Sequence, residues 1–446
     1  MTLPVLQKLR NDAVDIFSAG LQAVDPLSAL RRCVGLRHGH LSIGDHTFDL
    51  SAFKHIYIIG AGKASGPMAA AMEDILGNRI TQGLVVVKYG HTATLSHVSQ
   101  IEAGHPIPDK KGQQGANAIQ NLAGRAGSDD LVICLMSGGG SALMPAPSLG
   151  LTLTDKQKTI EALLACGADI HEINTIRKHL SQIKGGWLAV STHPARMVSL
   201  ILSDVVGDDL DIIASGPTVP DPSTYEDCLN LIEKYNLSDK LPERVCTHIA
   251  RGARGAFEET PKPGHPSFEK TDHFIVANNF QALAAAKAHA ESRGYHTIVL
   301  TSLLTGETRD AAYFHAAIIK EIIQSGHPIK RPACLLSGGE TTVTLKGKGK
   351  GGRNQEFALA LVEALKDQAP LVCLSAGTDG TDGPTDAAGA IMDSTTYSRA
   401  KEQCLDVSAY LANNDAYRFF EKLGDLLITG PTRTNVMDIH IGLVGP

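Results

Sequence analysis

Three residues have the types and the positions that phosphate chemistry would need. Lys63 comes after IIGAG, where a helix is expected to begin, so its ammonium group and the free N–H groups of the helix start favour an anion. Asp204 comes after SLILS and could accept a hydroxyl proton or bind a divalent cation. Arg353 opens another expected helix within GGRNQ, and its planar guanidinium suits a phosphate. These are the candidate catalytic residues.

A glycine-rich segment, SGGGS at residues 137–141, lies between an expected strand and an expected short helix. Because glycine has no Cβ, the backbone N–H groups of residues 138–141 could converge on an anion. We expect this loop to bind a phosphate or a carboxylate, and the alternative is an ordinary sharp turn. The full set of candidate contacts for phosphate or substrate is Ser137, Gly138, Gly139, Gly140, Ser141, Arg177, Lys178, Glu340 and Asn354.

The segment at residues 171–186 has the apolar spacing of an amphipathic helix, which Gly185 and Gly186 are predicted to end. Arg177 and Lys178 fall on the face opposite the apolar stripe. Such a face is most often simply the solvated side of a helix. The functional alternative is that Arg177 or Lys178 reaches an anionic substrate.

Two loops in the C-terminal half add candidate ligands. In SAGTDGTDGPTD, Asp379 and Asp382 follow an expected strand, and their carboxylates suit a metal ion or the hydroxyls of a nucleotide. In residues 337–360, Glu340 follows another strand and TTVTL is predicted as a hairpin strand. The loop rich in glycine and lysine before Arg353 is expected to be mobile and to close over phosphates, the alternative being a disordered basic hairpin.

Several common catalytic motifs are incomplete or absent. The turn Gly60-x-Gly62-x-x-Ser65 lacks the third glycine of a dinucleotide-binding fingerprint, and the same segment does not fit a phosphate-binding P-loop. The sequence contains neither a G-x-S-x-G nucleophile elbow nor an H-E-x-x-H zinc motif. His105 is the most suggestively placed histidine, but a single histidine in such a loop is more often structural. The absence of these motifs argues against the catalytic triad of a hydrolase.

The apolar runs before the candidate residues are short and nearly continuous, as in strands covered on both faces of a parallel sheet. They alternate with helical segments, which is typical of a doubly wound α/β fold, whose ligands bind beyond the carboxyl ends of the strands. A polar segment rich in proline and glycine at residues 253–270 marks a domain boundary. We predict a larger N-terminal α/β domain with a doubly wound, mostly parallel sheet at residues 1–255 and a smaller C-terminal α/β domain at residues 270–446.

The composition excludes other kinds of protein. The chain of 446 residues is 43% hydrophobic and 20% charged, which is typical of a globular protein of about two domains. A net charge of −6 and an aromatic content of 5% argue against nucleic-acid binding. No apolar run is long enough to span a membrane, and the 8 cysteines form no C-x-x-C pair. We therefore expect a cytoplasmic protein whose ligands are small anions.

A series of motifs occurs in order along the chain: GAGKAS, GHPIPD, SGGGSAL, NTIRKHLSQIKGG, LSDVVGDDLDIIASGPT, SGGETTV, GKGGRNQEFALA and SAGTDGTDGPTDAAGA. Together they closely resemble the glycerate kinase family, whose C-terminal part is the MOFRL domain. The resemblance covers roughly residues 50–446 and is far more specific than any one motif. It implies ATP-dependent phosphorylation of D-glycerate, usually to 2-phosphoglycerate, with an active site in the cleft between two α/β domains. It also implies active-site roles for Lys63, Asp204 and Arg353.

The residues and the resemblance lead to one mechanism. Asp204 orients or deprotonates the glycerate hydroxyl, Lys63 and Arg353 compensate phosphate charge, and the loop at residues 137–141 holds a phosphate or the glycerate carboxylate. ATP and Mg²⁺ are the expected cofactors, with Mg²⁺ bridging ATP oxygens near the acidic loops. The expected partners are D-glycerate and ATP, without nucleic acid or membrane, and a homodimer is left open.

Two other functions remain open at this stage. One is an NAD(P)H-dependent hydroxypyruvate reductase, a name that older labels give to some members of the family. The other is a sensor that binds a sugar acid or a nucleotide without catalysis. The sequence also leaves open whether the 2- or the 3-hydroxyl is phosphorylated and which domain binds ATP.

Overall fold

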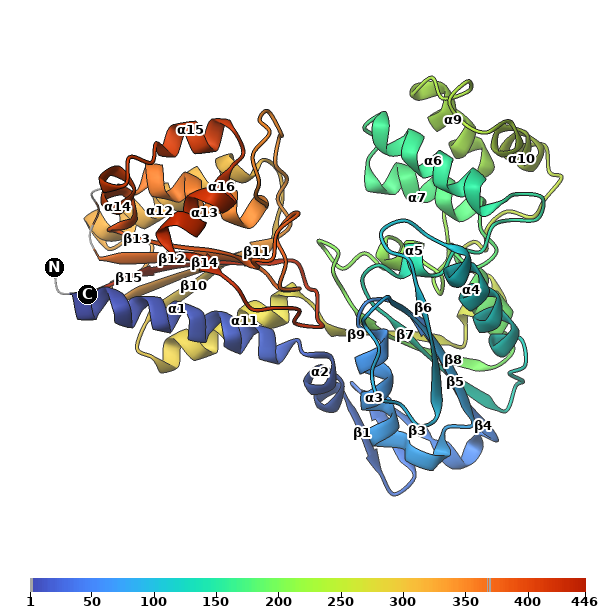
Figure 1. The fold of residues 1–446 in the computed structure, drawn as a ribbon. Helices are drawn as coiled ribbons and strands as arrows, with labels where there is room; N and C mark the ends of the chain where they lie inside the picture. Colours follow the sequence, from blue (N-terminus) through green and yellow to red (C-terminus); the bar gives the residue numbers. More distant parts are fainter. Residues whose placement is uncertain (1–2, 367, 369) are drawn as a thin grey trace. The chain divides into compact units, whose positions relative to one another are not determined.

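The computed structural model, which describes residues 3–366, 368 and 370–446, divides into two compact α/β units (Figure 1). The parallel-sheet unit comprises residues 29–203 and 208–276. The mixed-sheet unit comprises the N-terminal residues up to 28, residues 204–207 and residues 277–446. Each unit is built around a 6-stranded sheet. The predicted two-domain α/β fold is confirmed.

The sheet of the parallel-sheet unit has the strand order β6-β5-β4-β7-β8-β9, and its pairings from β6 to β8 are parallel. Its strands are β4 (His55–Ala61), β5 (Gln82–Lys88), β6 (Val98–Ala103), β7 (Asp130–Met136), β8 (Arg196–Leu202) and β9 (Thr271–Ala277). Every residue of β7 is buried, as expected for a strand covered on both faces. The strand order reverses between β4 and β7, so their carboxyl ends form the point where such sheets bind ligands.

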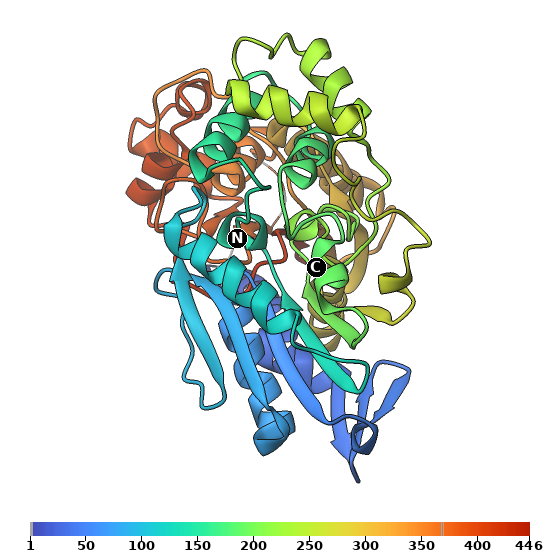
Figure 2. The same cartoon turned by 90° about the vertical axis from the view of Figure 1, so that its right-hand side faces the viewer.

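Helices cover both faces of this sheet. Figure 1 and Figure 2 show α3 (Ser65–Leu76) on one face and α4 (Lys110–Ala123) on the other. The short helix α5 (Gly140–Leu143) directly follows β7, and the short helix α8 (Trp187–Thr192) directly precedes β8. A separate helical group packs around its own apolar core and consists of α6 (Leu153–Ala165), α7 (Ile170–His179), α9 (Tyr225–Lys234) and α10 (Glu243–Ala253). A small antiparallel sheet contains β1 (Val34–Arg37), β2 (His40–Ile43) and β3 (His46–Asp49).

The sheet of the mixed-sheet unit has the strand order β10-β11-β15-β12-β13-β14. Its strands are β10 (His296–Leu304), β11 (Ala333–Gly339), β12 (Leu371–Gly377), β13 (Gly389–Asp393), β14 (Leu426–Leu427) and β15 (Asp438–Val444). Because β15 is antiparallel to both of its neighbours, β11 and β12 run in the same direction. The carboxyl ends of β11 and β12 therefore lie at the same edge as the first residue of β15.

Helices also cover both faces of the mixed sheet (Figure 1). On one face, α1 (Leu3–Ala23) packs against α11 (Asn279–Ser292). On the other face lie α12 (Thr308–Ser325) and α13 (Arg353–Ala364), whose apolar side chains form the core with the sheet. The remaining helices of this unit are α14 (Thr396–Glu402), α15 (Val407–Ala412) and α16 (Ala416–Leu423). Between the first helix and the small antiparallel sheet lies α2 (Pro26–Cys33).

The unit boundaries differ from the predicted ones in two ways. The chain leaves the parallel-sheet unit after residue 276 rather than between residues 255 and 270, because β9 first completes the edge of the parallel sheet. The N-terminal helix α1 belongs to the mixed-sheet unit, where Arg10 pairs with Asp393 and Asp425 at 2.6 Å each. The prediction placed α1 in the N-terminal domain because α1 is close to that domain in the sequence.

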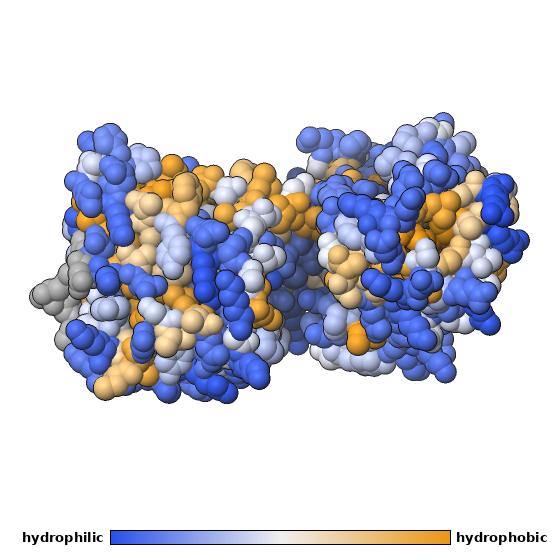
Figure 3. Space-filling model, turned by 90° about the horizontal axis from the view of Figure 1, so that it is seen from above, coloured by the Kyte–Doolittle hydropathy of each residue, from blue (hydrophilic) through white to orange (hydrophobic). Residues whose placement is uncertain are grey.

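The face drawn in Figure 3 carries mostly hydrophilic side chains, interspersed with groups of hydrophobic ones. Within the described residues, none of the helices combines the length and the apolar content that crossing a bilayer requires. This finding agrees with the absence of a long apolar run in the sequence.

Candidate active site

Lys63 and the glycine-rich loop lie together at the switch point of the parallel sheet. Lys63 follows β4, the loop follows β7, and these two strands pair in parallel over their whole length. The backbone N–H of Lys63 donates to the carbonyl of Gly138 at 2.9 Å. Two segments that are far apart in the sequence thus meet at the edge where sheets of this kind bind ligands.

Ser137 links the two segments through its side chain. Its Oγ accepts from the N–H of Ala64, at the start of α3, at 3.0 Å. Only glycine fits at position 62, because a Cβ there would lie 2.0 Å from the Oγ of Ser137. The hydroxyl of Ser137, predicted as a ligand contact, is therefore used within the fold.

The glycine loop offers fewer N–H groups than predicted. The N–H of Gly140 donates to the carbonyl of Ser137 at 3.2 Å, so it closes a turn instead of facing an anion. Gly139 has a φ of +83°, and a Cβ there would lie 2.8 Å from the His105 ring and 3.5 Å from Cγ of Lys63. The glycines are thus needed for a tight turn and for the approach of two side chains, and Gly140 is removed from the predicted set of N–H donors.

His105 lies beside this loop among cationic side chains. Burial, with smaller contributions from Lys63, Lys88 and His91, lowers the pKa of His105 to about 4. The imidazole is therefore neutral at pH 7, where it can both donate and accept a hydrogen bond. A neutral histidine next to lysines favours an anionic ligand at the carboxyl end of β4.

The segment with Arg177 and Lys178 folds differently from the prediction. Helix α7 ends at His179, and Gly185 (φ +56°) and Gly186 (φ +88°) lie in the turn before α8. The expected solvated face is wrong as well, since Lys178 is fully buried and Arg177 is half-buried. The helix packs both faces because the helical group covers one side and the sheet loops cover the other.

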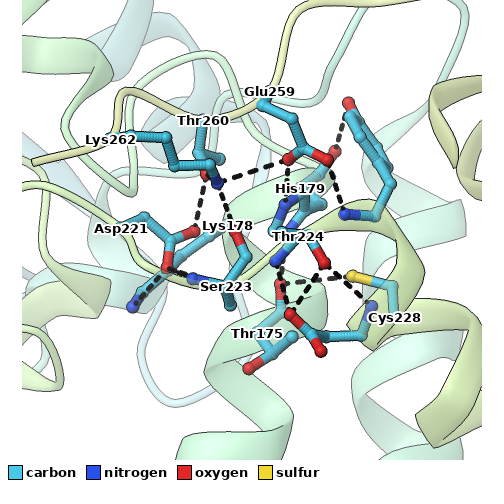
Figure 4. A network of polar contacts seen from close by, with 12 residues as sticks. Thr175, Lys178, His179, Asp221, Ser223, Thr224, Cys228, Glu259, Thr260 and Lys262 are labelled. Carbon is cyan, nitrogen blue, oxygen red and sulfur yellow. Dashed lines mark hydrogen bonds and ion pairs between the residues drawn. The ribbon is translucent and has the colours of Figure 1, made fainter. Parts of the chain in front are cut away.

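Lys178 is held by two carboxylates within the fold, and Figure 4 shows one of them, Asp221. Its Nζ donates to Asp211 and, at 3.4 Å, to Asp221. Asp221 also accepts from Thr260 Oγ1 at 2.8 Å and from Ser223 Oγ at 2.7 Å. Because its buried ammonium group already has counterions, Lys178 is a structural residue, and its predicted contact with substrate is corrected.

Replacing Lys178 by methionine is expected to lower the free energy of unfolding by about 3 kcal/mol or more, because Asp221 would remain as a buried charge without its partner. Denaturant or thermal unfolding measures this loss. The control is Lys234→Met, which removes an exposed lysine paired with Glu172 and should cost less than about 1 kcal/mol. An unchanged stability together with a raised KM for the substrate would restore Lys178 to the binding site.

Arg353 is anchored at the ligand edge of the mixed sheet. Gly339 at the end of β11 and Gly377 at the end of β12 both pair with Asp438, the first residue of β15. Arg353 donates to the two oxygens of Asp438 from Nε (2.6 Å) and Nη2 (3.1 Å), and to Glu340 from Nη1 (2.8 Å). Burial alone would lower the pKa of Arg353, but these carboxylates outweigh it and raise the pKa. The guanidinium therefore stays charged and fixed in direction.

Asp438 has an exposed fraction of 0% and is itself oriented by Asn354, whose Nδ2 donates to Asp438 at 2.8 Å. Asn354 Oδ1 accepts from Ser375 Oγ at 2.7 Å, and this hydroxyl contacts Nδ1 of His440 at 2.8 Å. Asn354, predicted as a ligand contact, thus acts within the fold and positions the carboxylate that holds Arg353. A guanidinium carries more N–H donors than these contacts use, so Arg353 retains donors for a phosphate.

The loop before Arg353 is held against the segment at residues 413–415 by backbone hydrogen bonds. The backbone N–H groups of Lys346 and Gly347 donate to Asn414 Oδ1 at 2.8 and 2.9 Å. A Cβ at Gly347 would lie 2.2 Å from the carbonyl of Asn413, so this glycine allows close packing of two backbones. Residues 341–345, all described by the structure, form no strand apart from one isolated bridge. The predicted hairpin strand is therefore wrong, whereas the predicted closure of this loop over phosphates stays a prediction.

Asp382 caps the helix that Arg353 opens. Its Oδ1 accepts from the N–H of Asn354 at 3.0 Å and its Oδ2 from the N–H of Gln355 at 2.8 Å. Burial, opposed by these hydrogen bonds, raises the pKa of Asp382 to about 7. The structure gives Asp382 a capping role that was not predicted, and its predicted role as a metal ligand stays a prediction. Among the described residues, no group of three or more His, Cys, Asp or Glu side chains could hold a metal ion, and a metal role for Asp379 stays a prediction.

The substitution Asp382→Ala is expected to destabilise the protein by about 2 kcal/mol, since the first N–H groups of α13 would lose their acceptor inside the protein. The free energy of unfolding from denaturant titration tests this. The control Asp386→Ala removes an exposed carboxylate that contacts only the hydroxyl of Tyr417 and should have a smaller effect. A lost dependence of activity on Mg²⁺ at unchanged stability would instead support the metal role of Asp382.

Asp204 follows β8 and is half-buried. Its Oδ2 accepts from Nδ2 of Asn435 at 3.2 Å, and Asn435 Oδ1 accepts from the N–H of Met437 at 3.2 Å, which fixes the direction of the amide. These residues lead directly into Asp438. The structure therefore groups Asp204 with Arg353 in the mixed-sheet unit, while Lys63 lies with the glycine loop in the parallel-sheet unit.

Comparison with known proteins identifies the family. Residues 12–250 match a family described as a domain of unknown function (DUF4147), and residues 333–438 match the MOFRL family. A glycerate 2-kinase from Pyrococcus horikoshii is 43% identical over 441 residues, which cover 99% of this chain and 98% of the relative. The chain belongs to the glycerate kinase family.

Other members of the glycerate kinase family agree with this assignment. A D-glycerate 2-kinase from Thermotoga maritima is 41% identical over 439 residues, covering 98% of this chain and 99% of the relative. A solved glycerate kinase structure from Thermotoga maritima is 40% identical, with a TM-score of 0.87 and coverage of 98% of this chain and 100% of that chain. A relative from Agrobacterium vitis, 43% identical over 390 residues and matching 87% of each chain, is provisionally named hydroxypyruvate reductase. The resemblance inferred from the motifs is confirmed.

In this glycerate kinase family member, sequence reasoning missed two features of the site. Asp438 carries the main contact of Arg353, and its only signal in the sequence is a carboxylate at the first position of an apolar strand. Lys184 lies against Ser141 of the glycine loop, and the sequence places it only on the polar side of an expected helix. Both depend on segments that are distant in the sequence.

Proposed function

We propose that this protein transfers the terminal phosphate of ATP to the 2-hydroxyl of D-glycerate. The observation that carries the proposal is the similarity over nearly the whole chain to relatives named glycerate 2-kinases. The enzyme would yield 2-phosphoglycerate and ADP. A cytoplasmic location remains an expectation from the sequence.

The side chains described above suit phosphoryl transfer, which needs mainly positioning and charge neutralisation. The oxygen of the 2-hydroxyl attacks the terminal phosphorus of ATP while Asp204 accepts the proton of that hydroxyl. The bond between the terminal phosphorus and the bridging oxygen breaks, and this oxygen leaves with ADP. Lys63 and Arg353 compensate the charge on the transferred group. The alignment of Arg353 by Asp438 supports this role, because a fixed donor needs no reorganisation during the reaction.

Mg²⁺ is expected to accompany ATP, but among the described residues the predicted carboxylates belong to no group of three or more His, Cys, Asp or Glu side chains that could hold a metal ion. Asp382 is engaged in capping α13, and Asp379 accepts from the N–H of Thr381 at 3.0 Å. We therefore derive no step through a protein-bound metal ion.

The reductase alternative rests on the name of two relatives from Agrobacterium vitis and on the glycine turn after β4. Both glycines of that turn have other reasons to be glycine. A Cβ at Gly60 would lie 2.1 Å from the carbonyl of Leu135, and one at Gly62 would lie 2.0 Å from Ser137 Oγ. The turn is therefore explained by packing between β4 and β7 without a nicotinamide cofactor.

An assay of ADP release with D-glycerate, L-glycerate and other hydroxy acids tests the proposal, and phosphorus NMR of the product identifies the phosphorylated hydroxyl. The proposal predicts release of ADP with D-glycerate and formation of 2-phosphoglycerate. Oxidation of NAD(P)H by hydroxypyruvate without release of ADP would establish the reductase instead. If the protein binds glycerate and ATP but catalyses neither reaction, the sensor alternative would be supported instead.

A further inference from the structure

Three basic side chains gather beside the glycine loop without an acidic partner. They are Lys156, Arg177 and Lys184. Their hydrogen bonds go to neutral groups: Lys156 donates to the carbonyl of Leu180 at 2.8 Å, and Lys184 donates to the carbonyl and the hydroxyl of Ser141 at 2.7 and 3.0 Å. Of the carboxylates that the structure describes, none forms an ion pair with these three residues.

This arrangement is unfavourable in the protein alone. Lys184 is 2% exposed and Lys156 is 6% exposed. Burial, together with Arg177, lowers the pKa of Lys156 to about 7. Burial, Lys156 and Arg177 lower the pKa of Lys184 well below its ordinary value. Buried cations normally have a counterion, as Lys178 has in the same unit, so this cluster fits a negative charge that comes from a ligand.

A line of neutral polar groups adjoins the cations. Ser141 Oγ contacts Ser215 Oγ at 2.9 Å, and Ser215 Oγ donates to Asn174 Oδ1 at 3.0 Å. Arg177 Nη1 donates to the same Oδ1 at 3.3 Å. The Nδ2 of Asn174, a residue that is 1% exposed, has no hydrogen-bond partner within the part of the chain that the structure describes. An unused donor beside unpaired cations points to an acceptor with negative charge.

We propose that Lys184, Arg177 and Asn174 bind the carboxylate of the acceptor acid. This inference rests on the proposed function, and it assigns D-glycerate to the parallel-sheet unit. Ser141 and Arg177 are half-buried, so a small ligand can reach the cluster. The same loop contacts Lys63 through Gly138, which brings an acid anchored at Ser141 to the loop that also holds the candidate phosphate-binding lysine. A phosphate of ATP is the other candidate for the anion. The carboxylate of D-glycerate suits these buried donors better, because it is a small group with a single charge.

Steady-state kinetics of Lys184→Met and Arg177→Met, which keep an apolar stem, separate the two sources. We expect each variant to raise the KM for D-glycerate about tenfold to 100-fold and to change the KM for ATP less than about twofold. The preference for D-glycerate over glyceramide, which lacks the carboxylate charge, should fall by a similar factor. The control Lys234→Met removes an exposed lysine of the same unit and should change none of these values. A raised KM for ATP at an unchanged KM for D-glycerate would overturn the proposal in favour of the nucleotide.

Thermal unfolding gives a second test that does not need activity. In each variant the stabilisation by D-glycerate should disappear, and Arg177→Met, which removes a hydrogen bond to a neutral amide, should leave the midpoint of the ligand-free protein close to that of the wild type. A purely structural lysine would instead lower the midpoint and leave the stabilisation intact, which would overturn the proposal. If wild-type protein is stabilised by D-glycerate but does not phosphorylate it, the proposed function fails and the carboxylate site stands. If it phosphorylates D-glycerate and the variants bind D-glycerate normally, the site fails and the function stands.

Discussion

Replacing Arg353 by alanine is expected to lower the turnover of D-glycerate on the order of 10² to 10³-fold, by analogy with the loss of a donor that stabilises charge in a transition state. The effect should be large because Asp438 and Glu340 hold the guanidinium in one direction while leaving N–H donors for the phosphate. The measurement is kcat at saturating ATP and D-glycerate. Unchanged turnover would remove Arg353 from the reaction.

Two further variants separate the charge of Arg353 from its direction. Arg353→Lys keeps a positive charge but cannot match both oxygens of Asp438, so it should recover only part of the lost turnover. Asp438→Asn keeps the shape of the side chain that orients Arg353 but removes its negative charge. This variant should lose less turnover than Arg353→Ala. If Arg353→Lys turns over as fast as the wild type, the charge alone matters and the anchoring by Asp438 has no role in catalysis.

Replacing Asp204 by asparagine is expected to reduce kcat on the order of 10² to 10⁴-fold, the range found for a positioned general base. The amide oxygen of the new side chain can still accept from Asn435, so the local structure should persist while the proton acceptor is lost. Rates of ADP release with D-glycerate test this expectation. The Michaelis constants should change less than kcat.

The matched control for Asp204 is Asp209→Asn, because Asp209 lies in the same acidic segment but is exposed. Its turnover should stay close to that of the wild type. Equal losses in both variants would show that the segment responds to any removed charge, and the assignment of Asp204 as the base would be wrong.

Much of the fold could be predicted from local patterns. The apolar runs before Lys63 and Asp204 are the strands β4 and β8. Such patterns are reliable because a strand buried on both faces must be continuously apolar, and because glycine and serine end it. The exception is the segment with Arg177, where the apolar stripe continues past the end of α7 through a turn that also packs inward.

The roles of individual polar residues were less predictable. Lys178 and Asp382 have the residue types of a ligand site, yet the structure gives one a pair of buried carboxylates and the other a helix start. The sequence does not contain the distances to these partners. The same limit hid Asp438 and the cation cluster around Lys184, since each depends on segments that meet only after folding.

The sequence by itself determined the α/β class, the strands and helices that carry the candidate residues, and, through ordered motifs, the family. These properties follow from periodicity and short-range chemistry, which are written along the chain. Only the tertiary structure decided which buried cations have a carboxylate beside them and which have neutral partners. That difference arises because burial and counterions depend on neighbours in space: Lys178 and Lys184 have the same side chain, and only Lys178 has carboxylates beside it.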